Sequence, residues 1–169
     1  MRPLFSSSYS KLHLVVQGYD STWEKVESKF IVRRYFEEVL DGGNLDLVDE
    51  LFDPQYVLHD PNAPQEVCGV EGSKQFVGMF RGAFPDIAHT IEDQIAEGDK
   101  VVTRLKAHAT QKGELMGIPP TGEEVTIEGI SIWRIANGKI RECWVNYDAL
   151  GLMQQLGVIP GPEEHAQVV

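Results

Sequence analysis

Hydrophobic positions recur at helical spacing through the first half of the chain. Within residues 21–41, the apolar side chains that share one helical face are Val32, Phe36, Val39 and Leu40. Ser21 precedes Glu24 by the three residues of a capping box, which marks a helix start. Gly42 and Gly43 follow the apolar pattern, and glycine suits the left-handed backbone of a helix end. A helix is therefore predicted over residues 21–41.

Two further helices and a short strand are predicted before Pro85. Asn44 is a suitable cap for a helix over residues 45–52, and residues 56–60 have the composition of a short strand. A helix over residues 70–84 is predicted from apolar positions on one face, which are Phe76, Val77, Phe80 and Phe84.

The second half of the chain alternates apolar and polar residues, which is typical of strands. Four such stretches are predicted at residues 87–97, 101–110, 125–135 and 139–147, followed by a short helix at residues 149–156. Helices first and antiparallel strands afterwards predict an α+β domain in which three N-terminal helices cover a curved antiparallel sheet. Such a cone has an apolar interior that suits a small ligand.

Length and composition indicate one globular domain. The 169 residues include 42% hydrophobic and 24% charged residues, which is ordinary globular usage. We expect the domain to span residues 21–158, with a C-terminal tail over residues 159–169. Residues 1–20 are expected to form either an extra edge strand or a poorly ordered extension.

The charge balance excludes several classes of partner. Fifteen Lys and Arg residues against 26 Asp and Glu residues give a net charge of −11, which repels nucleic acid and anionic lipid surfaces. A membrane span is not expected, because the chain has no apolar run of about 18 residues. Cys68 and Cys143 are too few for a disulfide framework, which favours a reducing cytoplasm.

Three segments carry a resemblance to a known family. Residues 36–52, the Met-Gly-Ile-Pro-Pro-Thr-Gly loop within residues 113–122, and residues 144–157 with their Gln-Gln-Leu-Gly end are similar to the SnoaL-like polyketide cyclases of the nuclear transport factor 2-like superfamily. The resemblance covers about residues 24–157 and implies a cone-shaped α+β barrel. It also implies a cofactor-independent intramolecular aldol ring closure on an apolar or polycyclic carbonyl compound. Because sheets of this superfamily often pair face to face, a homodimer is expected.

The last strand offers the first candidate site. Side chains alternate across a sheet, so Trp144, Asn146 and Asp148 share one face. The resemblance implies that Asp148 is the acid/base, because a carboxylate in an apolar cavity has a raised pKa and can shuttle a proton near neutrality. Trp144 and Asn146 would then bind the substrate. Asp148 also directly precedes residues 149–156 and could cap that helix instead, and the two roles are compatible.

Other candidates come from the remaining strands and from one helix. His59 is either a second acid/base or hydrogen-bond donor at the cavity rim, or a structural or surface group. Arg104 and His108 share a face with Lys106 and either line a wet pocket or meet solvent. Tyr56 and Phe80 complete the candidate substrate-binding set, although an aromatic stripe such as that of Phe80 is often plain core.

The chain departs from its relatives at one position and leaves alternative functions open. Many relatives carry Thr-His where this chain has Thr110-Gln111, so a histidine-assisted mechanism would need His108 or His59 as a substitute. Epoxide hydrolases of the same superfamily use two aspartates and an arginine. Arg104 and Asp148 match two of these, but Lys106 stands where the second aspartate is needed, which disfavours that reaction.

A non-enzymatic binding or interaction module is the main alternative to a cyclase. We expect no cofactor and no metal, because the acidic pairs lack metal-ligand spacing and no glycine-rich loop follows a strand.

Overall fold

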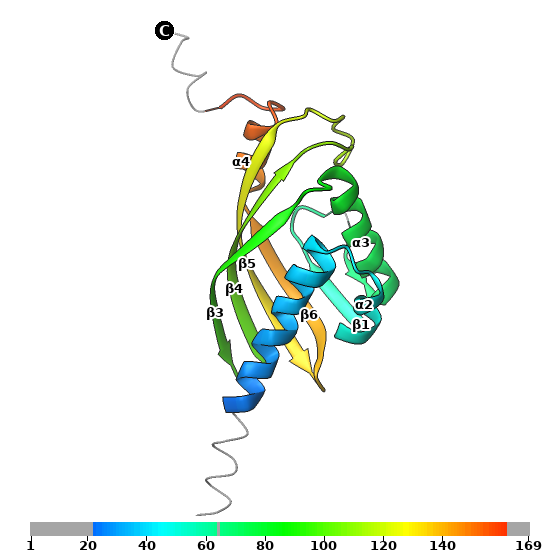
Figure 1. Ribbon diagram of the computed structural model, residues 1–169, viewed down its shortest axis with the longest axis vertical. Helices are drawn as coiled ribbons and strands as arrows, with labels where there is room; N and C mark the ends of the chain where they lie inside the picture. The colour runs from blue at the N-terminus through cyan, green and yellow to red at the C-terminus, as the bar shows by residue number, and fades with distance from the viewer. Residues whose placement is uncertain (1–21, 64, 162–169) are drawn as a thin grey trace, which may run out of the picture.

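A curved sheet of six strands in the order β2-β1-β6-β5-β4-β3 runs through the molecule (Figure 1). The computed structural model describes residues 22–161 except residue 64. The strands are β1 (Phe52–His59), β2 (Val67–Cys68), β3 (Ala88–Glu97), β4 (Lys100–Thr110), β5 (Glu124–Ala136) and β6 (Lys139–Tyr147). The predicted α+β class is confirmed, and the sheet stays open because β2 and β3 form its two edges.

One strand pair departs from the predicted antiparallel sheet. β1 and β6 run parallel, with Leu58 opposite Cys143 and His59 opposite Trp144, whereas the other pairs in the sheet are antiparallel. β1 also begins at Phe52, earlier than predicted. A parallel pair joins segments far apart in the chain, and its partners cannot be identified from local turn signals.

Three helical segments cover the concave side of the sheet, as predicted (Figure 1). Residues 22–34 are α-helical and continue into η1 (Tyr35–Asp41), a π-helical segment. The other two are α2 (Asp46–Leu51) and α3 (Gly69–Ala83). Ser21 of the predicted capping box, residues 1–20 and residues 162–169 of the predicted tail lie outside the described residues.

The core lies between these helices and the concave face of the sheet. Tyr35 and Phe36 of η1 pack their rings against Trp133 of β5 at centroid distances of 5.1 and 5.6 Å. Trp133 is buried, whereas its neighbour Ile132 on the other face of β5 is exposed. A second cluster around Phe84 packs against Leu152 of α4 (Ala149–Gln155) at the other end of the molecule.

Candidate active site

An apolar cavity lies inside the cone, between the helices and the sheet. Its walls include Tyr35, Tyr56, Phe80, His89, Trp133 and Tyr147. Its volume is about 120 Å³, whereas a single water molecule needs roughly 10–15 Å³. The cavity therefore has room for a small organic ligand.

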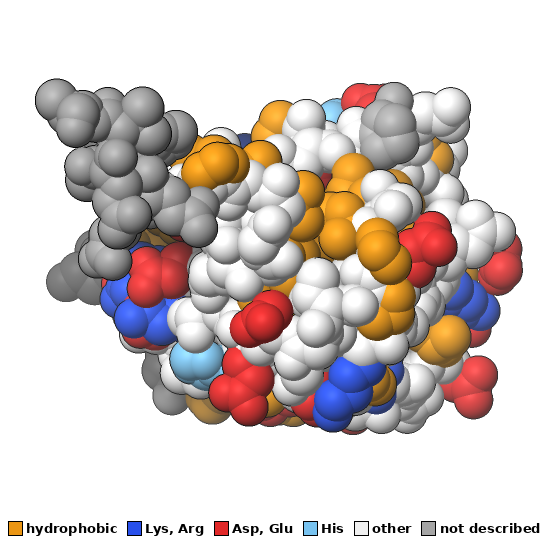
Figure 2. All heavy atoms as spheres, turned by 90° about the horizontal axis from the view of Figure 1, so that it is seen from above, with side chains coloured by type: hydrophobic (Ala, Val, Ile, Leu, Met, Phe, Trp, Pro, Cys, Tyr) orange, Lys and Arg blue, Asp and Glu red, His pale blue; other side chains and the backbone are white. Residues whose placement is uncertain are grey.

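The cavity continues into a groove on the surface. Asp60, Phe76, Phe80 and Tyr147 line both the cavity and this groove, so they mark the mouth between the two. The exposed side chains of Met79 and Met116 extend the groove. Seen end-on, the molecule gathers hydrophobic side chains near the middle of one face, with charged groups around them (Figure 2).

The face of β6 that lines the cavity is the one opposite to the predicted face. Cys143, Val145 and Tyr147 line the cavity. Trp144 and Asn146 instead line a shallow hollow on the outer side of the sheet. The predicted alternation is confirmed, but the placement of Trp144 and Asn146 at the cavity is corrected, because alternation alone does not say which face the helices cover.

Asp148 stands at the start of α4, outside the cavity wall. Its Oδ1 accepts a hydrogen bond from the Gly151 amide at 2.8 Å, and its side chain is exposed. Its own amide donates to the Glu128 carbonyl at 3.0 Å. The expected capping bond is thus present, and the acid/base role implied by the resemblance stays a prediction.

Replacing Asp148 with Ala should lower the free energy of unfolding by about 1 kcal/mol, the usual cost of losing a helix N-cap. Asn at this position should cost only a few tenths, because its amide oxygen still accepts the Gly151 amide. Urea denaturation of both variants measures the difference. Equal stabilities of the Ala and Asn variants would show that this cap contributes nothing.

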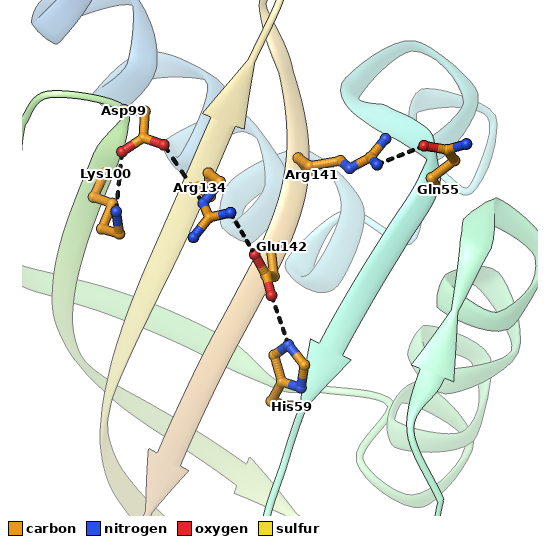
Figure 3. Close-up of polar contacts among 7 residues, drawn as sticks. All are labelled: Gln55, His59, Asp99, Lys100, Arg134, Arg141 and Glu142. Carbon is orange, nitrogen blue, oxygen red and sulfur yellow. Dashed lines mark hydrogen bonds and ion pairs between the residues drawn. The ribbon is translucent and has the colours of Figure 1, made fainter.

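His59 lies in a charged network on the outer face of the sheet (Figure 3). Its Nδ1 is 3.0 Å from Glu66 Oε1, and its Nε2 is 2.9 Å from Glu142 Oε1. The ring stacks on Trp144 at a centroid distance of 5.3 Å. Arg134 bonds the other oxygen of Glu142 at 3.1 Å. Both ring nitrogens of His59 are therefore engaged by carboxylates, and its acid/base role stays a prediction.

Arg104 and His108 also point away from the cavity, on the outer face of β4. Arg104 pairs with Glu92, and Lys106 bonds the same carboxylate at 3.3 Å. His108 Nδ1 is 3.0 Å from Thr126 Oγ1, on an exposed surface. These side chains therefore lie on a solvent-exposed face, which was one of the two alternatives predicted from the sequence. Arg104 and Asp148 do not come together in the cavity.

Tyr56 and Phe80 do line the cavity, and their substrate-binding roles stay predictions. The Tyr56 hydroxyl donates a hydrogen bond to the Cys143 sulfur, and burial raises the pKa of both groups. Phe80 packs on Phe76 at a centroid distance of 4.8 Å beside the cavity mouth. Phe84 of the same predicted stripe is fully buried core.

Asp60 is the carboxylate that sequence reasoning missed. It lines the cavity mouth, and its Oδ1 accepts hydrogen bonds from the amide and the side chain of Asn62 at 2.8 and 3.2 Å. Burial, and to a smaller extent the negative charge of Asp60, raises the pKa of Tyr147 to about 12. The signal was present in the chain, because Asp60 follows Tyr56 and Leu58 at alternate positions and so shares their inward face.

Within the described ranges, no cluster of three or more His, Cys, Asp or Glu side chains is placed to hold a metal ion. No helix in the part of the chain that the structure describes is long and apolar enough to cross a membrane.

The chain is similar to a known protein family. A family model described as SnoaL-like polyketide cyclase matches residues 30–156. The chain belongs to this family. Aklanonic acid methyl ester cyclase DnrD from Streptomyces peucetius is 33% identical over 134 residues, which cover 75% of this chain and 88% of that protein.

Two further similar proteins come from the same genus. Nogalonic acid methyl ester cyclase from Streptomyces nogalater is 32% identical over 123 residues, covering 72% of this chain and 91% of that protein. The solved structure of TsrD from Streptomyces laurentii has a TM-score of 0.72 at 26% identity, covering 80% of this chain and 98% of that one. The SnoaL-like chain thus shares both its sequence pattern and its fold with these proteins.

The homodimer expected for this SnoaL-like chain stays a prediction. Ile130 and Ile132 are exposed on the outer face of β5, which is the face that a second copy would cover.

Proposed function

We propose that this protein is a cofactor-independent, cyclase-type enzyme that binds an apolar or polycyclic carbonyl compound in its cavity and moves a proton on it, as in an intramolecular aldol closure. The observation that carries the proposal is the Asp60 carboxylate at the mouth of a mainly apolar cavity, beside the Tyr147 phenol. The family membership and the cyclase names of the relatives support the same reaction type.

The proposed step needs only a base, a hydrogen-bond donor and correct positioning. Asp60 takes the proton from a carbon next to a carbonyl group, which leaves an enolate. The enolate carbon forms a bond to a second carbonyl carbon of the same molecule, whose oxygen then takes the proton back from Asp60. Substrate and product are therefore isomers, and no oxidant or co-reactant is consumed.

A phenol at the cavity wall suits the donor role in this step. Tyr147, like any phenol of ordinary or raised pKa, is protonated near neutral pH and can donate a hydrogen bond, whereas the Tyr56 hydroxyl already bonds Cys143. A donor aimed at a developing oxygen charge in a dry site stabilises it more than water does. The apolar walls hold the two ends of one substrate together, which replaces an unfavourable encounter with a fixed geometry.

The proposal is tested by incubating the purified protein, without added cofactor, with aklanonic acid methyl ester and with nogalonic acid methyl ester. The expected result is a product of unchanged mass and different retention time, whose NMR spectrum shows a new carbon–carbon bond. Saturable binding of either ester without any product would contradict the enzyme and favour the binding module.

A further inference from the structure

One residue of the cavity wall, His89, forms a pair with Asp41 that the proposed reaction step does not use. His89, at the start of β3, has only 8% of its side chain exposed and lines the cavity. Its Nδ1 lies 2.5 Å from Asp41 Oδ1, and its backbone amide donates to Asp41 Oδ2 at 3.0 Å. Both oxygens of Asp41 are therefore engaged by the same residue, which fixes the ring against the carboxylate.

The position of Asp41 depends on the π-helical winding of η1. The Gly42 amide bonds the Glu37 carbonyl at 3.1 Å, five residues back, so the wider turn ends at Asp41. Arg81 of α3 then donates to the Leu40 and Asp41 carbonyls at 2.5 and 2.7 Å. π-helical turns are rare and occur frequently at functional sites.

Gly43 allows Arg81 to approach this closely. Its φ is +73°, and a Cβ at this position would lie 2.8 Å from the Arg81 Nε. Three elements, η1, α3 and β3, therefore hold the Asp41–His89 pair in one arrangement.

The contact with Asp41 leaves a hydrogen-bond acceptor on the ring of His89, which lines the cavity. An ionised carboxylate only accepts hydrogen bonds, so the contact with Asp41 requires a proton on His89 Nδ1. In the neutral ring the other nitrogen, Nε2, then carries a lone pair. Within the described residues, the hydrogen bonds of the His89 ring all involve Nδ1, and the ring lies against Phe36 at a centroid distance of 5.2 Å.

We propose that His89, oriented by Asp41, forms a subsite that accepts a hydrogen bond from a hydroxyl group of the ligand, so that the cavity selects polycyclic aromatic compounds with a free phenol. Asp41 is a positioning residue, because it acts on the ligand only through the tautomer of His89. This inference rests on the proposed function only in that the cavity binds a polycyclic ligand.

The sheet order supports a ligand of more than one ring. His89 belongs to edge strand β3, whereas Asp60 follows β1 at the other side of the sheet, with β6, β5 and β4 between them. Both side chains nevertheless line the same cavity, so a ligand of more than one ring can lie between them. A fused ring system that places its carbonyl near Asp60 can extend its phenol to His89.

Two probes that differ only in the hydroxyl group test the subsite. We expect the wild-type protein to bind 2-hydroxyanthraquinone at least about tenfold more tightly than 2-methoxyanthraquinone, because the ether leaves a buried acceptor unpaired. Isothermal titration calorimetry measures both affinities. In His89→Asn, the side-chain amide can still donate to Asp41, but the acceptor Nε2 is lost. The tenfold preference should therefore disappear, with little change in the affinity for the methoxy probe.

Asp41→Asn gives the sharper test, because it should reverse the tautomer. The Asn amide oxygen can accept the His89 backbone amide while its NH₂ group donates to Nδ1, which moves the ring proton to Nε2 and turns the acceptor into a donor. The preference should then shift towards the methoxy probe, and ¹⁵N chemical shifts of His89 should report the exchanged tautomer. Asp49→Asn, which removes an exposed carboxylate paired with Lys74, is the matched control.

The outcomes separate this inference from the proposed function. Wild-type protein that cyclises an ester but binds both probes equally, or keeps its preference in His89→Asn, overturns the subsite and leaves the cyclase intact. A hydroxyl preference that depends on His89 in a protein that cyclises neither ester supports the subsite and overturns the cyclase. If neither probe binds the wild-type protein, or if His89 has the Nε2–H tautomer in it, the subsite is wrong.

Discussion

Replacing Asp60 with Asn should lower the turnover of a cyclisable ester at least about a hundredfold, the lower end of what a positioned general acid/base contributes. Asn has the same shape as Asp but cannot take the proton from carbon. Its side-chain oxygen can still accept the Asn62 amide, so the loop after β1 should keep its structure. Steady-state kinetics on the two methyl esters, with affinity measured separately, checks the result.

The comparison with Asp148→Asn decides between the two carboxylates. If Asp60 is the base, Asp148→Asn should keep most of the activity, because Asn still caps α4. A hundredfold loss in Asp148→Asn with near-normal turnover in Asp60→Asn would reverse the assignment and support the role implied by the resemblance. Asp49→Asn serves as a control for the removal of one surface carboxylate.

Replacing Gln111 with Ala should lower the free energy of unfolding by about 3 kcal/mol, because it leaves several polar groups of one loop without partners. Gln111 is fully buried, and its Oε1 accepts bonds from the Thr121 amide and hydroxyl at 3.2 and 2.7 Å. Its Nε2 donates to the carbonyls of Gly113, Ile118 and Pro119. One side chain thus holds together the loop that follows β4.

The measurement is urea denaturation, supported by a fall in melting temperature of roughly 6–12 °C. Gln111→Glu is the matched variant, because it keeps the side-chain shape while replacing the donor with an oxygen that faces three carbonyls. It should destabilise the protein as well, which separates the lost hydrogen bonds from the cavity that Ala creates. A loss below about 1 kcal/mol in both variants would show that this loop does not depend on Gln111.

The order of helices and strands was predictable because it depends on local periodicity. Apolar positions three or four residues apart identified the segment that becomes α3, and alternation identified β3 to β6, within a few residues of their observed bounds. The alternation on β6 also grouped Trp144 with Asn146 correctly. These features need only the preferences of neighbouring residues, so the α+β class and the succession of elements were predictable without the tertiary structure.

The tertiary structure alone decided which face of each strand lines the cavity. β6 carries large side chains on both faces, with Trp144 on one and Tyr147 on the other, so a period of two cannot say which face the helices cover. For the same reason, the candidates predicted from the sequence included His59, on the outer face, and not its neighbour Asp60, at the cavity mouth. Contacts between residues far apart in the chain decide which face is covered.

The Asp41–His89 pair shows the same limit most clearly. The two residues are 48 positions apart, and they meet because the π-helical end of η1 and the start of β3 are packed together. The local apolar spacing of this segment predicts a regular α-helix. The wider π-helical turn could not be predicted from it, because that turn is stabilised by packing and by Arg81. The sequence therefore determined the elements that surround the cavity, and only their packing decided which side chains point into it.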